Sequence, residues 1–222
     1  MKKLTLYLLL MIPCLVKAQF GLKGGLNFAN VTKASSINNS SRTGFHAGVF
    51  LAPPSNSIIG SRTELIYSRQ GYDYKSGTNT GNVNLDYIML PQYMSINITK
   101  YFSIMLGGQM AYLLNAKADS TASNSQTGNP YADGIMKFYN RFDYGYGGGI
   151  EIHPVSGLLI GARVNISLSK LYDANAYSSG SANEPPSFIP KVDVKNNVFQ
   201  IFAGWRFGKQ PESAKKKKQK DE

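Results

Sequence analysis

The stretch FDYGYGGGIEIHPVSGLLIGARVNISLS, residues 142–169, decides the fold because its side chains alternate in character with a period of two. In the second half, Ile160, Ala162 and Val164 alternate with Gly161 and Arg163. Alternation of this kind is typical of a strand with one apolar face. The short break PVSG between the two halves therefore predicts an antiparallel hairpin.

The same alternation recurs along the chain and gives eight candidate strands. They lie near residues 20–31, 44–51, 62–68, 83–97, 102–114, 142–152, 160–169 and 199–207. In the fourth segment, Leu85, Tyr87, Met89, Pro91 and Tyr93 share one face, which we expect to be the apolar outer face. Pro91 has no amide proton and weakens the strand locally. The pattern predicts an all-β protein.

The breaks between these segments alternate between short and long. The short ones are APPSNS, TKY and PVSG, and the long ones are TKASSINNSSR, DYKSGTNTG, ADSTASNSQTGNPYADGI and DANAYSSGSANEPPSFIPKVD. Bacterial outer-membrane barrels show this asymmetry, with short periplasmic turns and longer outer loops. We therefore predict an eight-stranded antiparallel up-and-down transmembrane β-barrel in the outer membrane, with both termini periplasmic.

A soluble up-and-down barrel would also have one apolar face, turned inward instead of outward. The polar faces of the segments are dominated by Gly, Ser, Asn and Gln, whereas a water-facing surface carries about 25–35 per cent charged residues. The apolar faces hold almost no charge, as a surface in contact with lipid requires. This contrast favours a lumen lined by small and polar residues.

The two ends of the chain are distinct from the barrel. Residues 1–18 have the basic, apolar and small-residue regions of a signal peptide, and we expect cleavage after Ala18. Pro13 before Cys14 argues against lipidation there, so the mature chain lacks thiols. We assign 19–208 to the barrel and 209–222 to a disordered, basic periplasmic tail, read as a solvated charge run or an anchor to anionic material.

The formal net charge of +11 does not predict nucleic-acid binding, because much of it lies in the two ends and the body has no clustered basic face. Aromatic residues of the apolar faces instead gather near the ends of the segments. These positions predict two girdles, although tyrosine is also a common strand residue. The girdle set is Tyr93, Phe102, Trp205 and Phe207 at the periplasmic ends and Tyr67, Tyr87, Tyr112 and Tyr144 toward the outer ends.

Charged residues on the inward faces fall in the periplasmic half of the lumen. They are Lys23, Arg62, Glu64, Glu151, Arg163 and Arg206. Buried charges require partners, and an eight-stranded lumen is only wide enough to be filled by side chains. We therefore predict a structural charge network, with Glu151 and Arg163 paired across the hairpin, in preference to a transport path.

The sequence offers few residues for chemistry. His46 and His153 are the only histidines, so a hydrolase with a histidine base would need one of them. We expect them at opposite heights of the barrel, His46 near the outer end, and predict no catalytic site. Five aspartates near the outer loops lack calcium-loop spacing, so we predict no metal site and no cofactor. These are Asp86, Asp119, Asp133, Asp143 and Asp173.

Seven segments resemble the PorT-like outer-membrane β-barrel family of the Bacteroidota. They are GLKGGLNFANV, ELIYSRQGYDY, LDYIMLPQYMSI, LGGQMAYLL, FDYGYGGGIEI, GARVNISLS and IFAGWRF. The resemblance implies a small barrel without a catalytic signature, in contact with outer-membrane lipid. The lysine-rich tail after Phe207 departs from barrels that end on the terminal aromatic residue.

We expect a non-enzymatic protein that displays extracellular loops for binding or envelope organisation, with an envelope protein as partner. The alternative is a subunit of a larger outer-membrane transport or secretion assembly. A barrel enzyme acting on lipid is the third hypothesis.

Overall fold

The computed structural model describes residues 19–32, 38–52, 58–76, 79–120, 135–173 and 193–208. The expected signal peptide and tail lie outside these residues. The strands are β1 (Gln19–Thr32), β2 (Ser40–Ala52), β3 (Ile59–Ser76), β4 (Asn79–Asn97), β5 (Phe102–Ser120), β6 (Phe142–Ile152), β7 (Leu158–Ser167) and β8 (Lys195–Arg206). One short 3-10 helix, η2 (Ile135–Phe138), follows β5.

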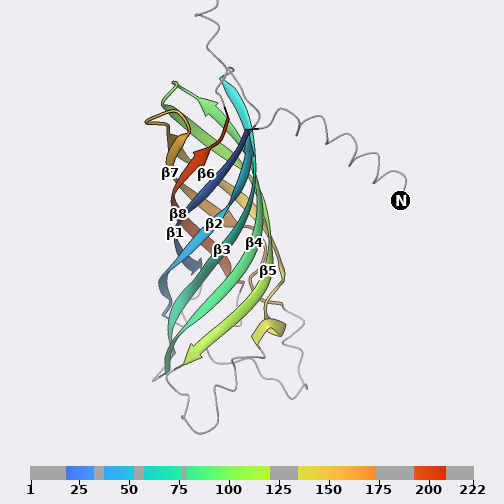
Figure 1. The fold of residues 1–222 in the computed structure, drawn as a ribbon. Helices are drawn as coiled ribbons and strands as arrows, with labels where there is room; N and C mark the ends of the chain where they lie inside the picture. The colour runs from blue at the N-terminus through green and yellow to red at the C-terminus, as the bar shows by residue number, and fades with distance from the viewer. Residues whose placement is uncertain are drawn as a thin grey trace, which may run out of the picture.

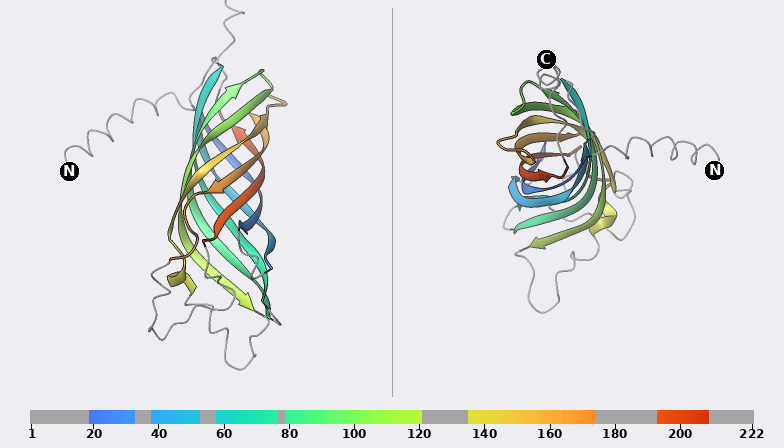
Figure 2. Two further views of the ribbon diagram at one scale, coloured as in Figure 1. Left: turned by 180° about the vertical axis from the view of Figure 1, so that it is seen from behind. Right: turned by 45° about the horizontal axis from the view of Figure 1, so that its top comes forward.

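Each strand pairs antiparallel with its neighbours in sequence, and β8 pairs with β1, so the sheet closes into one barrel (Figure 1). The predicted fold, an all-β barrel of eight antiparallel strands, is confirmed. Strand β1 begins and β8 ends at the same end of the barrel (Figures 1 and 2). Among the described residues, no helix is long and apolar enough to cross a membrane.

The alternation in sequence becomes an inside and an outside. In β1, Lys23 and Asn27 are buried in the lumen, whereas Leu22 and Leu26 are exposed on the outer wall. Other strands repeat this pattern, with large apolar side chains exposed outside. A closed barrel leaves no unpaired strand edge along its paired wall, which is the condition for placing backbone in hydrocarbon.

The inward face of β4 was predicted wrongly. Tyr87 and Tyr93, expected in the aromatic girdles, are only 1% exposed and lie inside the barrel. The outer face of this strand is formed instead by Leu90, Met94 and their neighbours of the same parity. Both faces of β4 are apolar, so alternation alone did not distinguish them. Pro91 does not interrupt the strand, since it lies opposite Gln109 of β5.

Strands β3, β4 and β5 reach farther than the others at the end opposite the termini (Figure 1). The sequence DYKSGTNTG, expected to be a long loop, mostly continues β3 and β4, which pair as far as Ser76 and Asn79. We call the part formed by 69–76, 79–86 and 115–120 the projection. It gives this end of the barrel a one-sided wall.

Candidate functional site

The half of the lumen nearer the ends of β1 and β8 where the chain enters and leaves the barrel holds a cluster of buried charges drawn from four strands. We call Lys23, Arg62, Glu64, Glu151 and Arg163 the lumen ion cluster. Glu64 accepts from Arg163 Nη1 at 2.7 Å and from Lys23 Nζ at 3.2 Å. Arg62 donates to both oxygens of Glu151, at 2.5 and 2.6 Å. Arg62 Nη1 is also 3.8 Å from Glu64, which joins the two groups.

Aromatic rings cover the cations of this cluster. Lys23 Nζ lies 3.6 Å from the centre of the Phe202 ring. The Arg163 guanidinium is 4.9 Å from the Tyr93 ring centre and 5.5 Å from that of Phe202. Such contacts stabilise a desolvated cation because the ring face is electronegative. Charge and ring together fill this section of the lumen.

Glycine makes room for the cluster at one point. Gly149 lies opposite Arg163 in the β6–β7 pair, and a Cβ at Gly149 would come 2.5 Å from the Arg163 Cβ. The absence of a side chain therefore lets the arginine stem occupy the lumen. This close approach is the structural role of one glycine in the run YGYGGG.

The specific pair expected from the hairpin, Glu151 with Arg163, does not form. Arg163 bonds Glu64, whereas Glu151 bonds Arg62. In a barrel this narrow, the opposite wall is within reach of a long side chain, so a diagonal neighbour on the next strand has no advantage. Arg206 is the predicted member that remains outside the ion pairs, and its buried Nε has no hydrogen-bond partner in the described part of the chain.

A layer of uncharged polar side chains continues the network toward the middle of the barrel. Gln200 Oε1 accepts from Arg163 Nε at 2.6 Å, and Gln200 Nε2 donates to Asn27 Oδ1 at 2.7 Å. Asn27 Nδ2 in turn donates to Ser68 Oγ at 2.9 Å. Buried polar groups are stable when they are hydrogen-bonded in this way. A continuous chain of bonds therefore crosses the lumen.

His46 belongs to this polar layer and not to the outer end where it was expected. It is buried, and its Nδ1 lies 2.8 Å from Asn27 Oδ1, which can only accept. Nδ1 is therefore the protonated nitrogen. The other nitrogen, Nε2, has no partner among the described residues, and no serine there bonds it. Within the described part of the chain, His46 therefore has no serine partner of the kind that a hydrolase would use.

His153 lies in the turn between β6 and β7, beside the lumen ion cluster. Its Nε2 is 3.2 Å from Glu151 Oε1 and 3.4 Å from Ser103 Oγ. A serine triad needs the two ring nitrogens to serve different partners, whereas here both partners meet the same nitrogen. Burial lowers the pKa of His153. The geometry supports a structural imidazole.

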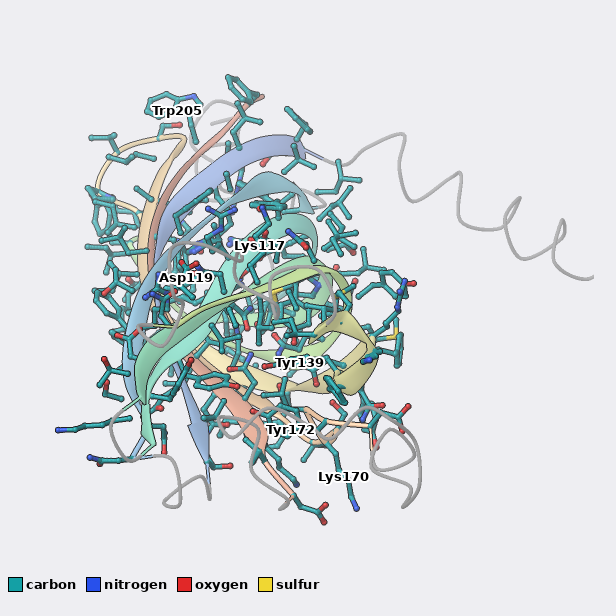
Figure 3. The ribbon with its side chains drawn as sticks, turned by 90° about the horizontal axis from the view of Figure 1, so that it is seen from below. Lys117, Asp119, Tyr139, Lys170, Tyr172 and Trp205 are labelled. Carbon is teal, nitrogen blue, oxygen red and sulfur yellow. The ribbon has the colours of Figure 1, made fainter. Side chains whose placement is uncertain are left out.

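The opposite end of the lumen is filled by apolar side chains that sequence analysis did not identify. Tyr72 is the centre of this loop-end core, and its hydroxyl lies 2.9 Å from that of Tyr139 and 2.6 Å from that of Tyr172. Ile135 and Phe138 of η2 are buried in the same cluster. Figure 3 looks at the barrel from this end and shows Tyr139 and Tyr172. The available signal was the apolar residues of GIMKFYN, residues 134–140, which run from the end of the expected long loop toward the expected strand that begins at 142.

The projection has the reverse polarity of the rest of the wall. Its outer side carries the ion pair between Arg69 and Asp86, with Nε 2.7 Å from Oδ1, and a second between Arg42 and Asp73 at 2.7 Å. Its inner side is apolar, with Tyr72, Val83 and Leu85 buried. A wall that is polar outside and apolar inside suits water. The change in polarity marks the end of the lipid-facing band.

The remaining residues predicted for the girdles lie on or near the outer wall. Tyr112, Tyr144, Trp205 and Phe207 are exposed outside, and Phe102 and Tyr67 are partly exposed there. Phe207 stacks on Phe20, with ring centres 6.0 Å apart. Their contact with the membrane interface stays a prediction.

Metal-binding side chains do not gather in the described residues, where no three His, Cys, Asp or Glu side chains lie close enough to hold an ion. Asp86 is paired with Arg69, and Asp143 accepts from Ser167 and Ser169. Asp133 lies outside the described residues. Asp86 and Asp143 therefore serve separate local contacts.

The sequence and the fold are both similar to known outer-membrane proteins. A family model described as outer membrane protein beta-barrel domain matches residues 16–173. The crystal structure of Ail, the attachment invasion locus protein of Yersinia pestis, is 16% identical, with 86% of this chain and 99% of that chain covered and a TM-score of 0.46. Neisserial surface protein A is 12% identical over 85% and 97% of the two chains, with a TM-score of 0.46. No curated protein matches the sequence.

Proposed function

Because the chain belongs to the outer membrane protein beta-barrel domain family, we propose that it is a non-enzymatic outer-membrane protein that displays a rigid binding surface outside the cell. The surface is the projection together with η2. The long-loop end faces outward, and both termini are periplasmic. Within the family, the resemblance of the segments quoted above supports a place in the PorT-like group of the Bacteroidota as part of this proposal.

The observation that carries this proposal is a lumen filled at both ends. The lumen ion cluster occupies one half and the loop-end core the other. An eight-stranded barrel has no spare cross-section once its inward side chains are packed. A filled barrel favours display over conduction.

The projection supports the direction of display. Its polar outer wall and its own apolar core allow it to stand in water beyond the lipid band. It carries exposed charges such as Lys75, Lys117 and Asp119, two of which are labelled in Figure 3. A folded wall loses less conformational entropy on binding than a flexible loop does.

Labelling of intact cells tests the proposed direction. In a Cys14→Ser background, Lys117→Cys in the projection and Lys100→Cys in the turn between β4 and β5 provide two exposed single cysteines. A membrane-impermeant maleimide should label Lys117→Cys on intact cells and Lys100→Cys only after the outer membrane is opened. Labelling of Lys100→Cys on intact cells, with Lys117→Cys labelled only after the outer membrane is opened, would place the projection in the periplasm and contradict the proposal.

A photo-crosslinking side chain at the same two positions tests binding. In whole cells or envelopes, position 117 should form a reproducible adduct with one macromolecule, which an excess of the purified wild-type barrel reduces. Position 100 is the matched control. Equal, non-competed adducts at both positions would leave no binding surface on the projection.

A further inference from the structure

The lipid-facing wall of β3, β4 and β5 contains polar residues where the band should be most apolar. On β4 the outward series is Ile88, Leu90, Gln92, Met94 and Ile96, so Gln92 is at its middle. Thr63 is at the middle of the outward series of β3, which runs from Ile59 to Tyr67. These two residues lie opposite each other in the sheet, and both are exposed.

Gly108 of β5 completes the row, since it lies opposite Gln92 on the other side. It is exposed, and a Cβ built there would approach only the Gly145 carbonyl oxygen, at 3.7 Å. The wall therefore has an open notch beside Gln92. We call Thr63, Gln92 and Gly108 the waist patch. Leu65, Leu90 and Met110 border it on one side, and Met94 and Leu106 on the other.

The hydrogen bonds of the waist patch are incomplete. Thr63 Oγ1 donates to Gln92 Oε1. The Gln92 amide nitrogen makes no hydrogen bond to any described residue, although it has two protons to donate. Hydrocarbon offers no acceptor, so an unpaired amide in that environment is unfavourable. We therefore expect a binding partner that offers a hydrogen-bond acceptor at the depth of Gln92 in the membrane.

We infer that the waist patch is the interface of a homodimer. A two-fold axis along the membrane normal keeps both copies at one depth. When the axis passes beside the waist patch, Gln92 of one copy lies opposite Gln92 of the other. The primary amide both donates and accepts, so each Nε2 can bond the Oε1 of the other copy. Such an isologous contact uses the same patch on both subunits. Small residues at the centre let the two walls approach closely, as they do between membrane helices.

The opposite wall lacks this combination of features. There Gly24 lies between Ala47 and Ala203, so the row is small but carries no polar side chain. Strand β8 is four strands from β4 in the closed ring. Ile201 of β8 is 45% exposed and Leu90 beside Gln92 is 44% exposed, which makes them a matched pair for comparison.

Disulfide crosslinking in native outer membranes tests the inference. In the full chain with Cys14→Ser, Leu90→Cys should form a covalent dimer on mild oxidation, and Ile201→Cys should form about tenfold less, as expected when one position lies in an interface. Heat-modified gel migration confirms that each variant is folded. Equal crosslinking at the two positions, or Leu90→Cys adducts only with another protein, would overturn the homodimer.

A second measurement tests Gln92 directly, with the cysteine label placed outside the waist patch. Copies labelled at Lys100→Cys with donor or acceptor dyes are reconstituted in bilayers at falling protein-to-lipid ratios, and energy transfer reports association. Gln92→Leu should raise the dissociation constant about tenfold, because a pair of hydrogen bonds is lost, whereas Val164→Leu on β7 should not. Transfer that follows random collision in the wild type, or that Gln92→Leu leaves unchanged, contradicts the inference.

Discussion

Arg62 of β3 and Glu151 of β6 form a two-bond ion pair across the lumen, with Nη1 2.5 Å from Oε2 and Nη2 2.6 Å from Oε1. The two strands are not neighbours in the barrel. A planar guanidinium fits a carboxylate in this forked geometry, which adds direction to the electrostatic attraction. The pair therefore ties together two parts of the wall that share no backbone hydrogen bonds.

Removing one partner of this pair should cost more than removing both. Arg62→Met or Glu151→Gln alone should lower the free energy of unfolding by about 3–5 kcal/mol, because an unpaired group is left buried. The double variant should lose less than either single variant, because neither partner is then left buried alone. Urea unfolding in detergent or bilayers, followed by circular dichroism, measures all three.

Arg42 of β2 and Asp73 of the projection are the matched control for this cycle. Arg42 Nη1 lies 2.7 Å from Asp73 Oδ1, but both side chains are partly exposed. The coupling of this pair should be about 0–1 kcal/mol because water screens it. If the losses at Arg62 and Glu151 were strictly additive, the coupling free energy between the two side chains would be zero.

Much of the barrel could be predicted because a period of two assigns each side chain to one face. That rule placed Lys23, Glu64 and Arg163 on the inward side of three different strands, and all three are buried there. It could not assign their partners. Contacts across the lumen depend on strand tilt and stagger, which alternation does not contain, so Glu151 was matched with Arg163 instead of Arg62.

The period also fails where both faces of a strand are apolar. Tyr87 and Tyr93 of β4 have the same neighbours in sequence as lipid-facing residues would have. Inside the barrel, Tyr93 donates to Asn165 Oδ1 at 2.8 Å and covers Arg163. These contacts come from strands that surround Tyr93 in the closed barrel, so its neighbours in sequence do not predict an aromatic residue inside. The loop-end core was missed for a similar reason, because η2 joins it from a segment without strand periodicity.

Tyr87 and Tyr72 should respond in opposite ways to loss of the hydroxyl. The Tyr87 hydroxyl is buried and has no hydrogen-bond partner in the described part of the chain. Tyr87→Phe should therefore leave the free energy of unfolding unchanged or raise it. Tyr72→Phe should lower it by about 1–3 kcal/mol, since the hydroxyls of Tyr139 and Tyr172 lose a partner.

Thermal or urea unfolding of the two phenylalanine variants under one set of conditions provides the measurement. Both substitutions remove a single oxygen and keep the ring, so packing is matched. A clear loss of stability in Tyr87→Phe, together with none in Tyr72→Phe, would contradict the assignment of these hydroxyls.

Reconstituted barrel should show no stable ion conductance. The lumen ion cluster and the loop-end core fill the two halves of the lumen with side chains, and water-filled channels are found in barrels of about 16 strands or more. Planar-bilayer recordings at a range of voltages provide the test, with a known porin as the positive control. Reproducible steps from a verified single barrel would disprove the filled lumen.

His153 should make the stability of the barrel depend on pH. Burial is the main cause that lowers the pKa of His153 in the folded barrel. The negative charge of Glu151 raises this pKa, whereas the positive charges of Arg206 and Arg62 lower it. The unfolded chain binds the proton near pH 6.5, so unfolding takes up a proton below about that pH. The contribution of His153 is therefore present above this pH and is lost as the pH falls.

His153→Gln separates this effect from other titrations, because glutamine keeps hydrogen-bonding atoms near Glu151 and Ser103 but does not titrate in this range. Between about pH 7.5 and 5.5, where exposed carboxylates stay ionised, the urea midpoint of the wild type should fall more steeply than that of His153→Gln. His46 is present in both proteins, so its titration cancels in the comparison. Parallel pH profiles for the two proteins would show that the folded barrel tolerates protonated His153 as well as the unfolded chain does.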